Sequence, residues 1–196
     1  MLHNDVLDVF RPGTPGRLRI GITGAPGVGK STLTRRLSAF LGVPPVFEIA
    51  RDFHDRGHTL GAGSSLETQL LMTMAQVAME SDLVQFVADR TIFDPLIHVD
   101  AVASYKSVPC PPLVVNCMAN YLRKAHRYNY SHVFVLHHQS VRHADGVRET
   151  DHRYGELVYQ RTLFWLNALG VRHSLIEGAS EDQWLQVCKL LGCDAG

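Results

Sequence analysis

The chain has no long apolar run and no excess of charge of either sign. No window approaches the roughly 18 consecutive apolar residues of a membrane-spanning helix, and the N-terminus lacks a basic segment followed by an apolar run. Lysine plus arginine and aspartate plus glutamate each number 19, and the sequence pI is about 7.2. These absences predict a cytoplasmic protein without membrane contact and without a general attraction to nucleic acid.

Cysteine is scarce. The chain has four cysteines without C-x-x-C spacing, which we expect to be reduced, namely Cys110, Cys117, Cys188 and Cys193. With 196 residues, of which 45% are hydrophobic, the chain is long enough for one domain with a sizeable core. Prolines and glycines near the start predict a flexible leader over residues 1–16, followed by a single domain over residues 17–196.

One stretch matches the pattern G-x-x-x-x-G-K-[ST] at every fixed position. An alternating apolar segment precedes it at 18–22, and an amphipathic helical pattern follows it over 31–41. In such a loop the glycines let backbone N–H groups turn around an anion, and the helix N-terminus adds partial positive charge. We therefore predict that a nucleoside triphosphate is bound by Gly24, Ala25, Pro26, Gly27, Val28, Gly29, Lys30, Ser31 and Thr32.

Two side chains of this loop have more specific expected roles. Lys30 should reach the β- and γ-phosphates as a cation. Ser31 offers a hydroxyl to Mg²⁺, a hard cation that prefers oxygen ligands and keeps several waters. ATP and Mg²⁺ are the cofactors that this pattern implies.

Apolar segments of strand length alternate with helical patterns along the chain. Strands are expected over 18–22, 46–50, 84–88, 133–136 and 171–176, and helices over 31–41, 64–81, 95–105, 113–122, 152–168 and 180–191. Ser64 with Glu67 forms a capping-box pattern, and Ser180 is the expected cap of the last helix. The predicted fold is α/β, a doubly wound parallel five-stranded sheet with helices on both faces and ligands at the strand C-termini.

Polar residues follow two of the expected strands. Glu48, Arg51 and Asp52 come after the second, where a carboxylate could accept the proton of an attacking hydroxyl. The base could be Glu48 or Asp52. Asp89 and Arg90 come after the third strand, where Asp89 could hold the Mg²⁺ shell and Arg90 could meet an acceptor or a phosphate oxygen.

Two missing motifs narrow the class of phosphate chemistry. No N-K-x-D tetrad is present, which argues against a guanine-specific switch. Asp89 is followed by Arg90 rather than by a glutamate that polarises water, which argues against a mechanical ATPase. A small kinase remains the favoured class, with a non-catalytic nucleotide-binding module or an ATPase as the alternative.

Two further polar segments have open interpretations. The segment from His137 to Asp151 lacks a core pattern and is predicted to be a lid that brings Arg142 and Arg148 toward the triphosphate. The basic, aromatic stretch from Tyr121 to Tyr130 suits either a nucleic-acid contact or core-facing tyrosines with cations at a helix C-terminus.

The order of these motifs resembles that of the AAA-type P-loop kinases related to the bacterial ribosylnicotinamide kinase domain. The resemblance covers residues 17–192 and rests on the phosphate loop, Glu48 to Phe53, Asp89-Arg90 with Asp94, and Asp145 to Arg148. It implies that the loop binds ATP, that Glu48, Arg51 and Asp89 face the acceptor and the metal, and that Arg148 belongs to a mobile lid.

A more distant resemblance links the chain to deoxynucleoside and thymidylate kinases, which place a similar acid-arginine pair at the same strand end. Some viral proteins of similar pattern resemble kinases that phosphorylate 5-hydroxymethyluracil within DNA. The resemblance thus implies an ATP- and Mg²⁺-dependent kinase. Its acceptor would be a nucleoside-like small molecule or hydroxymethylated DNA, and the protein could form a homodimer.

Overall fold

The computed structural model describes residues 18–47, 49–137 and 151–193, apart from the side chains of 125–129. In chain order the elements are β1 (Arg19–Gly24), α2 (Lys30–Leu41), β2 (Pro45–Val46), α3 (Ala50–Asp55), the 3₁₀ turn η1 (Gly61–Gly63), α4 (Leu66–Ser81), β3 (Phe86–Asp89), α5 (Asp94–Lys106), α6 (Pro112–Asn129), β4 (His132–Leu136), α7 (His152–Ala168), β5 (His173–Ile176) and α8 (Ser180–Leu191).

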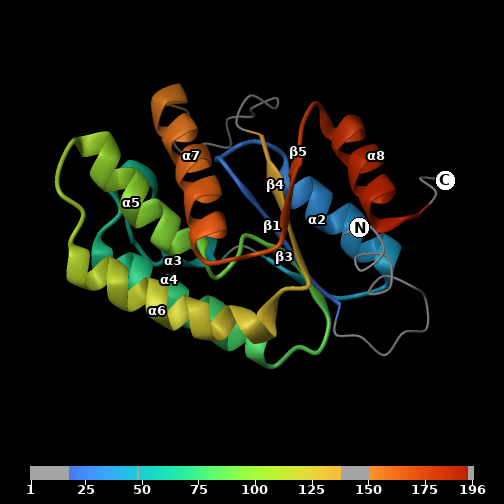
Figure 1. Ribbon diagram of the computed structural model, residues 1–196, viewed down its shortest axis with the longest axis horizontal. Coiled ribbons are helices and arrows are strands. Elements are labelled where there is room, and N and C mark those ends of the chain that lie inside the picture. Colours follow the sequence, from blue (N-terminus) through green and yellow to red (C-terminus); the bar gives the residue numbers. More distant parts are fainter. Residues whose placement is uncertain (1–17, 48, 138–150, 194–196) are drawn as a thin grey trace.

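The five strands form one parallel sheet in the order β2-β3-β1-β4-β5. Strand β1 lies at its centre. The chain passes from β1 to β2 at one edge, returns to β3 beside β1, and then crosses to β4 and β5 on the other side, as in a doubly wound fold. Helices cover both faces: Figure 1 shows α2 and α8 to the right of the sheet and α5, α6 and α7 to its left. The predicted α/β architecture is confirmed.

Each face of the sheet has its own apolar core because successive strand side chains point to opposite faces. On one face Ile20, Ile22 and Phe134 pack with α2 and α8. On the other, Val133 and Val135 pack with α5, α6 and α7. Burial on both faces explains why β3 and β4 read as nearly continuous apolar runs.

The second strand is shorter than predicted. Strand β2 pairs only with β3 and ends at Val46, and the side chain of Phe47 is 46% exposed. Ile49 and Ala50 are buried, but they belong to the start of α3 rather than to a strand. An edge strand with one neighbour has few ladder hydrogen bonds to hold it extended, so the chain turns into a helix early.

Two helix caps differ from the predicted residues. The N-cap of α4 is Ser65, whose Oγ accepts a hydrogen bond from the Thr68 amide at 3.1 Å, and Ser64 is instead bonded by Gln69. The N-cap of α8 is Ala179, and the Asp182 carboxylate accepts from its amide at 3.1 Å. Each observed cap lies one residue from the predicted cap, and the local sequence does not fix a helix boundary to a single residue.

Only one of the two apolar stripes of α6 is buried. Leu113, Cys117 and Tyr121 are exposed, whereas Met118 and Leu122 are buried against the core. Both stripes have helical spacing, and only the position of α6 against α5 selects between them.

Within the three described ranges, no helix has the length and apolar character needed to cross a membrane.

Candidate active site

The predicted phosphate loop joins β1 to α2 and depends on its glycines. Gly24, Gly27 and Gly29 adopt φ values of 136°, 75° and 95°, in the region that disfavours L side chains. A Cβ on Gly24 would lie 2.5 Å from the carbonyl oxygen of Leu136 in β4. The loop therefore bends around a concave backbone surface at the C-terminal edge of the sheet, the form suited to a phosphate.

Lys30 lies inside this loop. Its side chain is 2% exposed, and Nζ donates to the carbonyl oxygens of Gly24 at 3.1 Å and Ala25 at 2.6 Å. Ser31 is half-buried and Thr32 exposed in the first turn of α2. The positive charge of Lys30, the concave loop and the N-terminus of α2 together suit the polyphosphate of a nucleoside triphosphate.

Asp89 lies beside the start of the loop. It ends β3, is 2% exposed, and pairs in register with Ile22, two residues before Gly24. Mg²⁺ is held in such sites by one or two carboxylates together with substrate phosphates. The oxygen donors of Asp89 and Ser31 fit that ion.

Arg90 turns sharply away from the strand. Its φ is +77°, and its amide donates to the carbonyl oxygen of Ile22 at 2.9 Å. Strained backbone of this kind in a non-glycine residue is held by surrounding structure and concentrates at functional sites. The side chain is nearly buried and donates to Asp94 Oδ1 at 2.9 Å.

Asp94, the first residue of α5, accepts hydrogen bonds from both β1 and Arg90. Its Oδ1 accepts from Arg90 and from Thr23 Oγ1 at 3.0 Å, and its Oδ2 accepts from the amide and the hydroxyl of Thr91, both at 2.7 Å. Asp94 is 4% exposed. This carboxylate therefore fixes the positions of β1, Arg90 and the turn after β3 together.

A small hollow lies next to this carboxylate, lined by Ile49, Met72, Gln76, Arg90, Thr91, Asp94 and Pro95. It places the start of α3 beside Arg90. Arg51 and Asp52 lie in the first turn of α3, and both are exposed. Of the predicted substrate residues, Arg90 lines the hollow, whereas Arg51 and Asp52 belong to the neighbouring helix without lining it.

A buried acid lies behind the hollow. Gln76 donates to Glu80 Oε1 at 2.7 Å, and Tyr130 Oη donates to the same oxygen while accepting from the Ile92 amide at 3.0 Å. Burial raises the pKa of Glu80 to about 7, although these hydrogen bonds oppose the rise. For Tyr130, the core-facing interpretation of the basic, aromatic stretch is confirmed.

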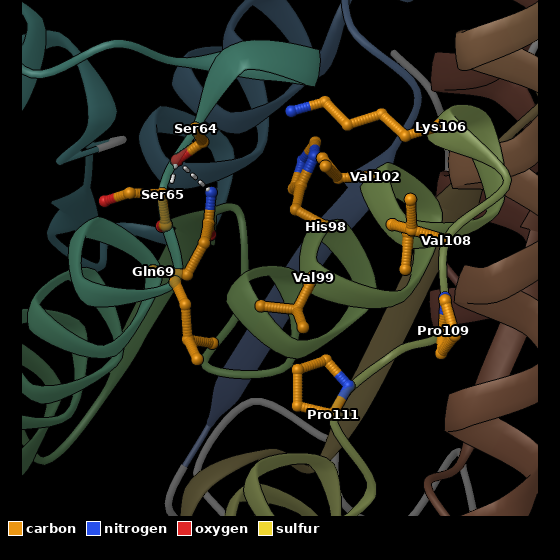
Figure 2. A pocket seen from close by; sticks show the side chains of 12 residues that line it. Ser64, Ser65, Gln69, His98, Val99, Val102, Lys106, Val108, Pro109 and Pro111 are labelled. Carbon is orange, nitrogen blue, oxygen red and sulfur yellow. Dashed lines mark hydrogen bonds between the residues drawn. The ribbon is translucent and has the colours of Figure 1, made fainter.

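A larger cavity of about 240 Å³ lies between α4 and α5. Figure 2 shows Ser64 and Gln69 on its α4 side, His98 and Val99 from α5, and Lys106, whose amine points toward the α4 side. Gln69 is 4% exposed, and its Oε1 has no hydrogen-bond partner within the described part of the chain. Gln69 and Gln76 are seven residues apart on α4, about 10 Å along the helix, so the cavity lies farther from the sheet edge than the hollow.

Three predicted site residues lie outside the described residues: Glu48, Arg142 and Arg148. The structure brings Lys30, Ser31, Asp89 and Arg90 to the same edge of the sheet.

Sequence reasoning gave no role to Asp94, although Asp94 is part of the motif that carries the family resemblance. The spacing of Thr91 and Asp94, three residues apart, is a signal that could have identified the turn that Asp94 closes, since Asp94 accepts from both the amide and the hydroxyl of Thr91.

The chain was compared with known families and structures. Residues 19–183 match the model of the AAA domain family. Deoxyadenosine kinase from M. mycoides with bound dCTP has 14% identity, covers 89% of this chain and 99% of its own, and gives a TM-score of 0.64. NadR in complex with NR has 16% identity and a TM-score of 0.64, over 82% of this chain and 46% of its own.

Thymidylate kinase from Ehrlichia chaffeensis has 14% identity and a TM-score of 0.56, covering 91% of this chain and 100% of its own. The comparison with curated proteins finds no match. At these identities the structural likeness concerns the fold. Given the phosphate loop, the strand order and a family match over most of its length, the chain belongs to the AAA domain family and has a P-loop kinase fold.

Proposed function

We propose that the protein is an ATP- and Mg²⁺-dependent kinase that transfers the γ-phosphoryl group to a hydroxyl of a nucleoside, a nucleotide or a modified base. The observation that carries this proposal is the register that sets Asp89 beside the phosphate loop, with Arg90 held next to it by Asp94. Phosphoryl transfer needs mainly positioning and charge stabilisation, and this edge of the sheet provides charged groups of both signs.

At the donor side, residues 24–32 bind the triphosphate, and Lys30 balances the charge of its terminal phosphates. Ser31 and Asp89 would hold Mg²⁺, which would neutralise charge on the phosphates. Arg142 and Arg148 belong to the proposed lid over about 137–151, and Arg148 stabilises charge on the transferring group. These last two assignments rest on sequence alone.

At the acceptor side, Arg90 contacts the acceptor or a phosphate oxygen. Glu48 or Asp52 accepts the proton of the attacking hydroxyl, and Arg51 contacts the acceptor. Support for this arrangement comes from the hollow between α3 and Arg90. The cavity between α4 and α5 accommodates the rest of the acceptor, because it is lined by the same two helices as the hollow.

The chemistry of that cavity suits a nucleoside-like molecule. Val99 and Val102 form an apolar wall, and Gln69 provides a buried carboxamide for a polar edge. Small-molecule sites combine mostly apolar lining with a few placed polar groups in this way. 5-Hydroxymethyluracil within DNA is one specific candidate, supported by the exposed Arg123 and Lys124 of α6.

Radiolabelled ATP offered with a panel of nucleosides, nucleotides and hydroxymethylated DNA tests the proposal. Label in one acceptor, dependent on Mg²⁺, is the expected result. Lys30→Met, which lacks the phosphate-binding charge, is the inactive control. Methionine is chosen because Lys30 is almost completely buried, and an unbranched side chain preserves more packing there than alanine. Label released only as inorganic phosphate, or retained as bound ATP, would instead establish an ATPase or a nucleotide-binding module.

A second arm separates DNA from small acceptors. Arg123, Lys124 and Arg127 are replaced together by glutamine. Activity on hydroxymethylated DNA should fall, with a shallower salt dependence, while activity on a free nucleoside is retained. Equal activity of this variant on DNA would exclude α6 as the DNA contact.

A further inference from the structure

Arg90 has a second contact that the proposed reaction does not yet use. Its Nη1 lies 3.0 Å from Nε2 of His98, one helical turn beyond Asp94 on α5. The other ring nitrogen of His98, Nδ1, lies 2.8 Å from the hydroxyl oxygen of Tyr154 on α7. His98 therefore stands between the arginine at the strand end and a helix on the far side of α5.

The chemistry of Arg90 and Tyr154 determines which ring nitrogen of His98 carries the proton. A guanidinium has N–H donors and no acceptor, so the atom that bonds to it must present a lone pair. His98 Nε2 is thus the acceptor, and the proton of the neutral ring is on Nδ1, which donates to Tyr154. An N–H on Nε2 would face an N–H of Arg90.

Tyr154 is itself fixed. Its side chain is fully buried, its amide donates to the capping carboxylate of Asp151 at 3.3 Å, and its ring packs edge-on against Tyr105 at 5.5 Å. Tyr105 in turn donates to Asp151 at 2.7 Å. The start of α7 therefore holds the Tyr154 oxygen in place for His98.

We propose that His98 is a positioning residue for Arg90. The neutral Nδ1–H ring, oriented by Tyr154, holds the guanidinium at the end of β3 by accepting a hydrogen bond at Nε2. The same ring lines the cavity between α4 and α5, so an acceptor in that cavity packs against the group that orients Arg90 (Figure 2). The catalytic consequence rests on the proposed kinase function, whereas the state of the ring does not.

The first experiment observes the ring directly. In protein labelled with ¹⁵N-histidine, protonated and unprotonated ring nitrogens resonate at well-separated shifts, and the spectrum of His98→Gln identifies the signals of His98. The expected result at neutral pH is a proton on Nδ1 and a lone pair on Nε2. Tyr154→Phe should shift the Nδ1–H signal, because the hydroxyl oxygen that accepts from it is lost, while Nε2 stays unprotonated toward Arg90. A proton on Nε2 in the native protein would overturn the proposal.

The second experiment uses a matched pair of amides. Glutamine places its amide near Nε2 and can still accept from Arg90, whereas asparagine places its amide near Nδ1 and reaches only Tyr154. His98→Asn should have a kcat about 10- to 100-fold below that of His98→Gln, the size expected for losing a hydrogen bond to a charged group. The KM for ATP should be the same in both, since neither touches the phosphate loop.

The two proposals fail differently. If the native protein transfers no phosphate to any acceptor, the kinase function is wrong, and the ¹⁵N spectrum still decides the state of His98. If the native protein is active and the asparagine and glutamine variants have equal kcat, the positioning role is overturned. Thermal melting of both variants shows whether each is folded. If the asparagine variant is unfolded, the kcat of Tyr154→Phe against that of the native protein decides the positioning role, and equal values overturn it.

Discussion

Gln183 of α8 donates through Nε2 to the carbonyl oxygen of Val28 at 3.2 Å, across 155 residues of sequence. The same amide donates to Gly178 at 3.1 Å, and Gln183 is 2% exposed. One buried side chain thus joins the middle of the phosphate loop to the turn after β5. The shape of the loop depends on the last helix as well as on its own glycines.

Gln183→Leu should loosen the loop without removing a phosphate ligand. The buried carbonyl oxygen of Val28 would lose this donor, which costs about 1–3 kcal/mol of unfolding free energy. The KM for ATP should rise while the acceptor KM stays constant. Gln160→Leu on the exposed side of α7 is the matched control. An unchanged melting temperature and ATP KM for Gln183→Leu would contradict the link between α8 and the loop.

Asp94→Asn should destabilise the fold and lower activity together. The substitution removes a buried charge partner of Arg90 and turns an amide toward donors from Thr23 or Thr91. Removing one member of a buried ion pair costs about 3–5 kcal/mol, which urea unfolding can measure. Asp82→Asn, at an exposed site, should change stability by less than about 0.5 kcal/mol. Similar values for both variants would show that Asp94 does not organise the site.

Asp89→Asn should weaken the dependence on Mg²⁺. The side chain keeps its shape but loses the charge that balances the metal, so the Mg²⁺ concentration at half-maximal rate should rise by about 10- to 100-fold. The measurement is a Mg²⁺ titration of the initial rate at saturating ATP. A superimposable titration curve would remove Asp89 from the metal site.

Glu80→Gln should change how stability depends on pH. The folded pKa of Glu80 is about 7, above its ordinary value of 4.5, so the folded state retains a proton that the unfolded chain releases. The unfolding free energy should therefore fall as pH rises from about 4.5 to about 7, by up to about 1.4 kcal/mol per unit.

His132 contributes the opposite slope over an overlapping range. Burial lowers its pKa from 6.5 to about 4, so its contribution to stability rises with pH between those values. Urea unfolding of the native and Glu80→Gln proteins at several pH values isolates the glutamate, because His132 is common to both. Parallel stability curves for the two proteins would show that Glu80 does not titrate in this range.

The phosphate loop and the strand-helix alternation could be predicted from the sequence because both are local. Gly24, Gly27 and Gly29 occur where the backbone needs positive φ, and no distant residue can substitute for that freedom. Periods of apolar residues likewise identify strands and helices before any packing is known. Asp89 was placed near the loop by the same reasoning, because parallel strands bring their C-terminal ends to one edge.

The tertiary structure alone decided which of several equivalent local patterns is used. Met118 rather than Cys117 is buried on α6 because α5 lies on that side, and β2 ends at Val46 because it has one neighbour. The partners of Arg90 and Val28 come from other elements, His98 one turn into α5 and Gln183 on α8. A hydrogen bond between residues far apart in the chain leaves no periodic trace in sequence, since it depends on how packed helices bring single atoms within about 3 Å.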